Sequence, residues 1–320
     1  MLITIGAFDG FHKGHKSLFD ICRENSDGNS WGVVTFQPHP SFFMGRLRKT
    51  LFTLPERKLL RAVLGIPKMF VFKFDDEMMR LSPEKFWQLL KSKINIDGLV
   101  MGSDFHFGHS RTGNTHCLEK LALNDGVKKV IIADLKNKSS YSSSRARNCI
   151  ACGDVESTAE ILGYPFFVFS KVIRGNQRGR TMKFPTANIF IDNGKMIPSD
   201  GVYSCAVFLP TFAQWYCGAL SIGNNPTFHD VQETRAEVNI LDFDRDIYGE
   251  EIAVILFRRL RGIQTFSSSC ELSEQIANDV EQCRTIYDEM MPKVNEFSQK
   301  LGEYTTKKDD DECILIRTVI

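Results

Sequence analysis

Two histidines near the start of the chain are the first residues whose types and spacing could do chemistry. His12 and His15 follow the apolar run of ITIGAFDGFHKGH, residues 3–15, with Gly14 between them. If a helix starts here, its unpaired N–H groups and positive dipole end favour an anion, and imidazole N–H groups would add donors to phosphoryl oxygens. The pair could also be structural or bind zinc, but no neighbouring cysteine or aspartate pattern completes a zinc site.

A second stretch that could bind an anion lies later in the chain. GNQRGRTMKFPTAN, residues 175–188, joins turn residues to three positive charges. The sequence contains neither GxxxxGK[ST] nor GxGxxG, so phosphate must be held in another way. Cys149 and Cys152 form a CxxC pair, but their core-like helical spacing favours packing over redox chemistry.

The first half of the chain must position His12 and His15. Apolar runs alternate there with helical periodicity, which predicts a parallel sheet with helices on both faces. The expected strands are residues 2–5, 31–36, 69–74, 98–101 and 127–133, and the expected helices are residues 16–23, 55–64, 83–94, 115–123, 143–152 and 155–162. Ligands of such a sheet bind beyond the carboxyl ends of its strands, where both histidines and His39 are expected.

The second half of the chain has a different sequence pattern. Short apolar runs at residues 167–173, 202–209, 215–222, 235–241 and 251–258 are separated by Gly, Pro, Asn and Asp, which predicts an antiparallel barrel or sandwich. Residues 270–301 return to helical periodicity and predict a single helix over the barrel. The end, TTKKDDDECILIRTVI, is expected to be a loosely ordered tail, with an added edge strand as the alternative.

Length and composition limit the class of protein. A chain of 320 residues suggests two domains, and 42% hydrophobic with 25% charged residues is an ordinary globular composition. The net charge of +1 gives no field for nucleic acid or an anionic membrane, so we expect small-molecule partners. We expect neither a membrane span nor a secretory signal, and nine scattered cysteines suit free thiols in the cytoplasm.

Several motifs together resemble one known family. GAFDGFHKGH is similar to the G-x-F-D-G-x-H-x-G-H signature of the nucleotidyltransferase superfamily. The resemblance narrows to prokaryotic bifunctional riboflavin kinase/FAD synthetases, over residues 1–291, through five further stretches: TFQPHP at 35–40, GSDFHFG at 102–108, SSSRAR at 142–147, GRTMKFPTAN at 179–188 and AEVNILDFDRDIYG at 236–249. It implies that the chain phosphorylates riboflavin to FMN and then adenylylates FMN to FAD, using ATP and Mg²⁺.

The resemblance also implies a domain plan. A doubly wound α/β FMN adenylyltransferase domain is expected at residues 1–157, a β-barrel riboflavin kinase domain with a C-terminal helix at 158–301, and a tail at 302–320. The alternatives are an enzyme that keeps only one activity and a flavin-binding regulator without turnover. The sequence does not fix the oligomeric state.

In the first domain, His12 and His15 are the implied transition-state donors to the transferring phosphate. Arg147 in SSSRAR is the implied triphosphate clamp, and Asp104 with Phe107 is expected beside the flavin. The residues implied to bind nucleotide here are Gly6, Phe8, Asp9, Gly10, Ser144 and Arg147.

In the second domain, Thr186 and Asn188 are the implied ligands of Mg²⁺ and of ATP phosphate, with Gly179 in the same phosphate-binding stretch. Glu237 matches the catalytic glutamate of the family and would accept the proton of the ribityl hydroxyl. Lys183 replaces the glycine usual in G-R-T-x-G-F-P-T-A-N, so this loop departs from the family pattern.

Overall fold

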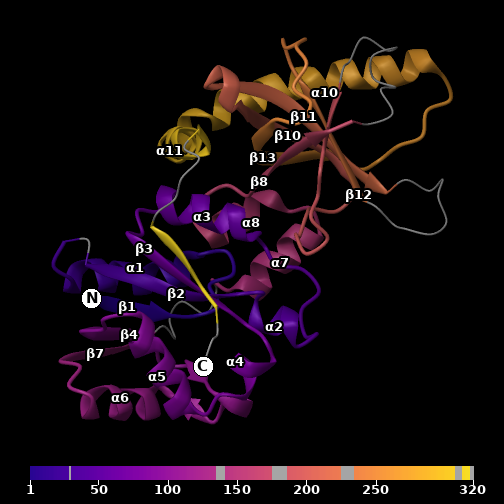
Figure 1. Cartoon of the computed structure of the whole chain (residues 1–320). Helices are drawn as coiled ribbons and strands as arrows, with labels where there is room; N and C mark the ends of the chain where they lie inside the picture. Colours follow the sequence, from indigo (N-terminus) through magenta and orange to yellow (C-terminus); the bar gives the residue numbers. More distant parts are fainter. Residues whose placement is uncertain (29, 135–140, 175–185, 225–233, 307–311, 318–320) are drawn as a thin grey trace. The chain divides into compact units, whose positions relative to one another are not determined.

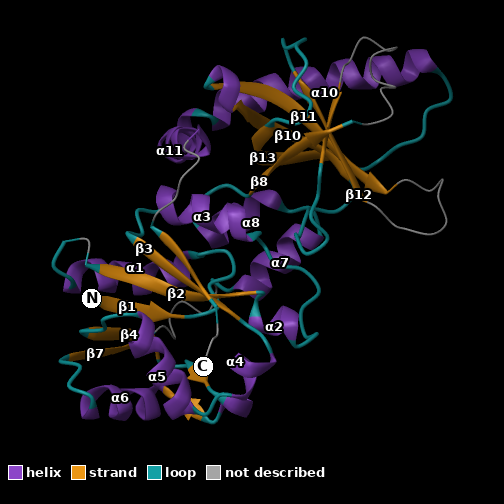
Figure 2. Cartoon of the chain, in the orientation of Figure 1, coloured by secondary structure: helices purple, strands orange, loops and turns teal. Residues whose placement is uncertain are grey.

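The computed structural model describes residues 1–28, 30–134, 141–174, 186–224, 234–306 and 312–317. These residues form two compact units, which can be followed by sequence colour in Figure 1 and by secondary structure in Figure 2. The first unit holds residues 1–50, 60–143 and the strand at the end of the chain, and the second holds residues 51–59 and 144–306. The sequence-based boundary at residue 157 differs from this division, because residues 144–157 cluster with the second unit.

The first unit is built on the expected parallel sheet. Its strand order is β14-β3-β2-β1-β4-β7 and every neighbouring pair is parallel. The strands are β1 Leu2–Ile5, β2 Trp31–Gln37, β3 Lys68–Lys73, β4 Gly98–Gly102, β7 Lys129–Ala133 and β14 Cys313–Ile316. The chain adds β2 and β3 on one side of β1, and then crosses to β4 on the other. The switch point at which such sheets bind ligands therefore lies between β1 and β4.

Short helices connect these strands. They are α1 Lys13–Asn25, α2 Pro40–Phe43, α3 Leu54–Val63, α4 Asp76–Arg80, α5 Pro83–Lys93 and α6 Thr115–Asn124. Local sequence explains several of their starts: the side chains of Ser82 and Asn114 cap α5 and α6 by accepting backbone N–H groups. A small hairpin, β5 His106–Phe107 with β6 Gly113–Asn114, follows β4.

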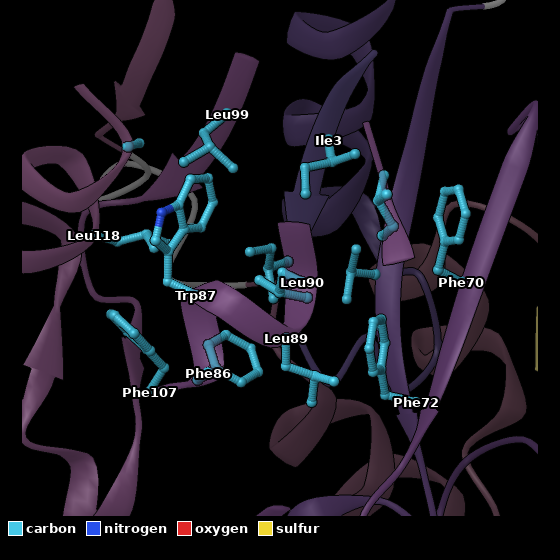
Figure 3. Packing of buried hydrophobic residues seen from close by; sticks show 14 of the residues in the cluster. Ile3, Phe70, Phe72, Phe86, Trp87, Leu89, Leu90, Leu99, Phe107 and Leu118 are labelled. Atoms are coloured by element: carbon cyan, nitrogen blue, oxygen red, sulfur yellow. The ribbon is translucent and has the colours of Figure 1, made fainter. Parts of the chain in front are cut away.

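Different helices cover the two faces of the sheet. On one face, α5 and α6 pack apolar side chains against Ile3, Phe70, Phe72 and Leu99, as Figure 3 shows. Side chains alternate along a strand, so Trp31 and Thr35 of β2 point to the opposite face. There Phe19 of α1 packs against Trp31 with ring centroids 6.3 Å apart. The helix that carries His15 is thus anchored on the sheet by an aromatic contact.

The second unit is built on a closed antiparallel barrel, in the order β10-β11-β12-β9-β8-β13. The strands are β8 Phe167–Ile173, β9 Thr186–Ile189, β10 Gly201–Leu209, β11 Gln214–Asn224, β12 Thr234–Ile240 and β13 Glu251–Arg261. Pairing of β10 with β13 closes the barrel, which removes its edges. Of the barrel or sandwich that the short apolar runs predict, the structure is the barrel, and β9 is a strand that the periodicity did not predict.

The helices of the second unit are α7 Ser143–Ala151, α8 Val155–Leu162, α10 Ser269–Met290 and α11 Asn295–Thr306. The expectation of a single helix at 270–301 is wrong: α10 ends at Met290 and a short 3-10 helix, Pro292–Val294, separates it from α11. Pro292 has no backbone N–H to donate, so it cannot continue α10. No helix in the described residues is long and apolar enough to cross a membrane.

The end of the chain also differs from the expected loose tail. Residues Cys313–Ile316 form β14, which lies parallel to β3 at the edge of the first unit's sheet. Ile316 is buried and joins the hydrophobic cluster of that unit. Burial of Ile316 and the parallel pairing with β3 therefore hold this segment as a strand, and the edge-strand alternative is the one observed.

A short segment of the first half belongs to the second unit. Glu56, at the start of α3, forms a buried ion pair with Lys195, whose ammonium lies 2.9 Å from its carboxylate. The same ammonium donates to the carbonyl oxygens of Leu51 and Phe167, and the N–H of Phe169 donates to Glu56. Residues 51–59 are thus joined to the base of β8 through buried polar contacts.

Candidate functional site

The loop between β1 and α1 brings His12 to the start of a helix. His12 is the N-cap residue of α1, and its Nδ1 accepts the backbone N–H of His15 at 3.3 Å. A neutral ring that accepts at Nδ1 carries its proton on Nε2, so His12 is a donor at Nε2. Gly14 allows this close packing, because a Cβ there would lie only 3.0 Å from Cε1 of His12 and 3.1 Å from the carbonyl oxygen of Tyr141.

This loop follows a backbone path that its aromatic residues disfavour. Phe8 and Phe11 have φ angles of 47° and 34°, in the left-handed region that costs a non-glycine residue about 1 kcal/mol or more. Both rings are buried and contact Phe19 of α1. The packing of two aromatic side chains therefore offsets the backbone strain.

His15 lies directly above His12 on the first turn of α1. The two imidazoles are stacked, with centroids 3.6 Å apart, and the ring of Phe8 meets His15 edge-on at 5.0 Å. Burial lowers the pKa of His15 well below 6.5, and the neighbouring His12 and His39 lower it further. His15 is therefore neutral at pH 7, and its buried Nδ1 has no hydrogen-bond partner among the described residues.

His39 reaches the same place from the next strand. It follows β2 as the N-cap of α2, and its Nδ1 accepts the N–H of Ser41 at 3.1 Å. Its imidazole also lowers the pKa of His15. Three histidines thus follow the carboxyl ends of β1 and β2, and the sequence predicted functional roles for two of them.

The first turn of α1 works against its own helix dipole. It contains Lys13 and Lys16 as well as the two histidines, and no acidic residue. Cations at the positive end of a helix are unfavourable unless an anion binds between them. The arrangement therefore suits a phosphate-bearing ligand better than a structural turn, and the described residues contain no group of three His, Cys, Asp or Glu side chains that could hold zinc.

The residues predicted after β4 are placed differently from each other. Asp104 is exposed just beyond the end of β4. Phe107 is 7% exposed, belongs to the hydrophobic cluster and contacts Phe86 at 5.4 Å between ring centroids, as labelled in Figure 3. The half-buried ring of Phe105 stacks on it at 5.6 Å. Contact of Phe107 with a flavin stays a prediction.

Ser144 and Arg147 lie on the first turn of α7, within the second unit. The guanidinium of Arg147 donates to the hydroxyl of Ser144 at 3.1 Å. The residue before them, Ser143, belongs to the first unit, where its hydroxyl donates to the carbonyl of Asp9 at 2.6 Å. Ser143, the second residue of SSSRAR, therefore contacts the loop that carries His12.

In the barrel, the predicted residues lie on two paired strands. Asn188 of β9 is directly opposite Glu237 of β12, and the hydroxyl of Thr186 donates to the Glu237 carboxylate at 3.3 Å. Opposite residues of an antiparallel pair share a face. All three side chains are half-buried and gather on one face, while Ala236 and Val238 beside Glu237 are buried on the other. Gly179 and Lys183 lie outside the described residues.

A pocket of about 80 Å³ opens beside these strands. It lies between β9, the end of β12 and the segment that follows β12. Its lining residues are Val172, Thr186, Ala187, Val238, Ile240 and the run from Phe243 to Tyr248. Three charged residues, Asp244, Arg245 and Asp246, lie among the apolar and aromatic ones, so the lining is mixed rather than apolar.

The structure thus brings the predicted residues together in two groups. The first group, in the β1–α1 loop and the first turn of α1, is Gly6, Phe8, Asp9, Gly10, His12 and His15. The second group, on one barrel face, is Thr186, Asn188 and Glu237. Sequence reasoning did not assign Thr35, whose hydroxyl donates to the carbonyl of Ala7 at 2.9 Å. The signal was its place at the start of TFQPHP, a stretch that the sequence analysis had singled out.

Comparison with known proteins gives matches over both units. The family model for FAD synthetase matches residues 1–146, and that for riboflavin kinase matches residues 162–287. The bifunctional riboflavin kinase/FMN adenylyltransferase of Listeria monocytogenes is 34% identical over 293 residues, covering 89% of this chain and 92% of that protein. Its counterpart in Bacillus subtilis is 34% identical over 292 residues, covering 88% and 90%.

A solved structure shares the whole fold. The crystal structure of a Streptococcus pneumoniae protein named as a macrolide-efflux protein is 30% identical, covers 88% of this chain and 93% of its own, and has a TM-score of 0.77. The likeness therefore includes both the parallel sheet and the barrel.

Proposed function

The chain belongs to the family of bifunctional riboflavin kinase/FMN adenylyltransferases, and we propose that it runs its two reactions at separate sites, one at the start of α1 and one on β9 and β12. The enzyme phosphorylates riboflavin to FMN with ATP, and then transfers AMP from a second ATP to FMN, which yields FAD and pyrophosphate. Riboflavin, FMN and FAD are therefore its substrates and products.

The observation that carries the first site is the composition of the first turn of α1. The N-cap and first turn of α1 carry two imidazoles and two lysines and no acidic side chain. In AMP transfer the FMN phosphate attacks the α-phosphorus of ATP directly, so the protein supplies alignment and charge neutralisation rather than a nucleophile. His12, from Nε2, and His15 donate to oxygens of the transferring phosphate.

The neutral state of His15 fits this role. Its pKa, lowered by burial and by His12 and His39, keeps the free enzyme from holding an unpaired buried cation. The negative charge of a bound phosphate raises the pKa of a neighbouring imidazole. The donor therefore gains positive character only when its ligand is present.

The remaining predicted residues complete the first site. We assign Gly6, Phe8, Asp9 and Gly10 to the loop around the nucleotide, Ser144 and Arg147 to its phosphates, and Asp104 and Phe107 to the flavin. The buried position of Phe107 supports contact through its ring edge rather than its face, because Phe105 already covers the face.

At the second site, we assign Glu237 as the base that accepts the proton of the ribityl hydroxyl as this hydroxyl attacks the γ-phosphorus. Support comes from the hydrogen bond with Thr186, which orients the carboxylate, and from Asn188 directly opposite. Gly179 is assigned to the phosphates of ATP.

The donor set at this second site fits Mg²⁺. The hydroxyl of Thr186 and the amide of Asn188 offer oxygen ligands, which this hard cation prefers, on one half-buried face. We assign both residues as its protein ligands. Bound there, the ion would neutralise charge on the ATP phosphates.

We also propose the division of labour of the chain. Residues 1–157 carry AMP transfer and residues 158–301 carry the kinase, with residues 51–59 added to the kinase because of their contacts in the second unit. We place the enzyme in the cytoplasm, where its nine cysteines, all unbridged in the structure, would stay reduced.

Two substitutions in the full chain test both sites, with FMN and FAD separated over time. His15→Ala, fed riboflavin and ATP with Mg²⁺, should accumulate FMN and form FAD roughly 100-fold more slowly, because a transition-state donor is lost. Glu237→Gln should lose FMN formation from riboflavin but still convert added FMN to FAD. Matched controls are His116→Ala, on an exposed part of α6, and Glu251→Gln, at the exposed start of β13.

Each outcome has a clear meaning. Wild-type FAD formation by His15→Ala would refute the role of His15, and wild-type kinase activity in Glu237→Gln would refute the base. Loss of both reactions in either variant would refute separate sites. A wild-type chain that forms FMN but no FAD, or neither, would favour the alternatives of a single retained activity or a regulator.

A further inference from the structure

The strained loop before α1 is held from outside by one side chain. Thr35 of β2 is fully buried, and its hydroxyl donates to the carbonyl oxygen of Ala7 at 2.9 Å. Its side chain lies on the same face of the sheet as α1, two residues along the strand from Val33 and four from Trp31. Thr35 therefore contacts the loop from the sheet and lies too deep to reach a ligand.

This hydrogen bond acts on the backbone of Phe8. The peptide group between Ala7 and Phe8 is planar, so holding the carbonyl oxygen of Ala7 fixes the orientation of the whole group. The φ angle of Phe8 is measured from the carbonyl carbon of that group, and its value of 47° is unfavourable for a residue with a side chain. The Thr35 hydroxyl thus supports the backbone angle that the loop would otherwise leave.

The backbone of Phe8 in turn places its ring against His15. The two rings meet edge-on with centroids 5.0 Å apart, and the Phe8 ring is 2% exposed. A different φ angle would move the ring away from the imidazole and leave His15 with room to turn. A path of direct contacts therefore runs from the Thr35 hydroxyl through Ala7 and Phe8 to His15.

We propose that Thr35 is a positioning residue for AMP transfer, which sets the orientation of His15 through the Ala7 carbonyl and the Phe8 ring. The inference deepens the first site and rests on the function proposed there for His15. Thr35 binds neither ATP nor FMN. Its removal should lower the rate of the chemical step and leave substrate binding nearly intact.

The neighbouring strand offers a matched control. Thr4 of β1 is also fully buried, and it lies on the same sheet face because it is in register with Val33 of β2. Its hydroxyl has no hydrogen-bond partner among the described residues. Thr4→Val and Thr35→Val thus replace the same hydroxyl by a methyl group on the same face of the sheet. Only Thr35→Val removes a hydrogen bond to the loop before α1, the one to the carbonyl oxygen of Ala7.

The test measures kcat and KM for FAD formation from FMN and ATP in the full chain, with riboflavin phosphorylation as an internal check of folding. Thr35→Val should lower kcat by roughly 10–100-fold with KM for ATP changed by less than about 2-fold, since a small misplacement of a catalytic group acts on the rate. Thr35→Ser keeps the hydroxyl and should stay within about 3-fold of wild type. Thr4→Val should behave as wild type.

A double variant separates this inference from the role of His15. If Thr35 acts through His15, adding Thr35→Val to His15→Ala should cause little further loss. Wild-type FAD formation by His15→Ala would sink the first site itself. Three results would overturn the positioning role of Thr35 alone, provided that His15→Ala slows FAD formation as expected. They are an unchanged kcat in Thr35→Val, equal losses of kcat in Thr35→Val and Thr4→Val, and a double variant in which the two single losses multiply.

A further variant covers the case in which Thr35→Val does not fold. Phe8→Leu keeps most of the buried volume but removes the ring edge that meets His15. It should show the same fall in kcat for FAD formation, and kinase activity should persist. A Phe8→Leu protein with wild-type kcat would overturn the path through the ring.

Discussion

Breaking the ion pair between Glu56 and Lys195 should destabilise the kinase unit strongly. Both residues are 1% exposed, and all three protons of the lysine ammonium are used, by Glu56 and by the carbonyls of Leu51 and Phe167. The ammonium also lies 4.3 Å from the ring centroid of Phe52. Replacing either charged partner leaves the other charge buried and uncompensated.

The size of the effect follows from this burial. Removing one partner of a buried ion pair costs about 3–5 kcal/mol. Glu56→Gln keeps an oxygen for the N–H of Phe169 but leaves Lys195 without its counter-charge, and Lys195→Met leaves the carboxylate in the same state. The double variant Glu56→Gln/Lys195→Met contains no unpaired charge, so it should be about 2–3 kcal/mol more stable than the sum of the single effects predicts.

Urea unfolding with both activities measured in parallel is the assay. With a slope of about 2 kcal/mol per molar urea, each single variant should lose riboflavin kinase activity at a midpoint roughly 2 M lower. The midpoint for FMN adenylylation should move less, because both residues belong to the second unit. Lys293→Met, which removes an exposed pair with Glu289, is the control and should shift neither midpoint.

Two results would refute the reasoning. Single variants with wild-type midpoints would mean that the buried charges are hydrated or rearranged at no cost. Single effects that simply add in the double variant would mean that the two residues stabilise the unit independently, as packing groups, rather than as an ion pair.

Two further predictions concern the first unit. The pKa of His15 is lowered in the folded state, so as the pH falls below 6.5 the unfolded chain binds a proton that the folded chain does not. The free energy of unfolding therefore falls by up to about 1.4 kcal/mol per pH unit until the pKa of the folded state is reached. His15→Asn should remove this loss, which urea unfolding between pH 5 and 7.5 would measure. Ile316→Ala in β14 should lower the free energy of unfolding, measured in urea through FMN adenylylation, by about 2 kcal/mol, whereas Leu315→Ala, 61% exposed on the same strand, should change it by less than about 0.5 kcal/mol.

Hydrophobic periodicity predicted the helices and strands that bury apolar side chains on one face or on both faces. Strands β1 and β8 have the predicted bounds, and most others differ by a residue or two, because alternating or continuous apolar runs fit a sheet directly. β9 escaped this reasoning since Thr186–Ile189 is short and half polar, and only its pairing with β8 and β12 makes it a strand. Pro292 was a readable signal that the long C-terminal helix is broken.

The candidate sites show the same limit. Motif spacing predicted that His12 and His15 lie at a helix start, and the structure has them there. Spacing did not predict the lowered pKa of His15, because that pKa depends on burial, on His12 and on His39, which follows another strand. The capping pattern of Thr53 and Glu56 in TLPE is local and readable, whereas the partner Lys195 lies far along the chain. Contacts between segments far apart in the sequence produce no periodic pattern, so they cannot be predicted from periodicity.

Because β14 lies near the end of the chain, the outer edge of β3 stays uncovered for much of translation. β3 leaves the ribosome early, but the strand that covers its outer edge is formed by residues 313–316, which are made only after the whole barrel. At about 5–20 residues per second, this interval lasts roughly 12–50 s. Throughout it, the backbone of the apolar run MFVF in β3 presents an open edge on which another nascent chain can pair. Residues 313–316, which are translated after the whole barrel, therefore end the exposure of this edge of the first sheet to aggregation.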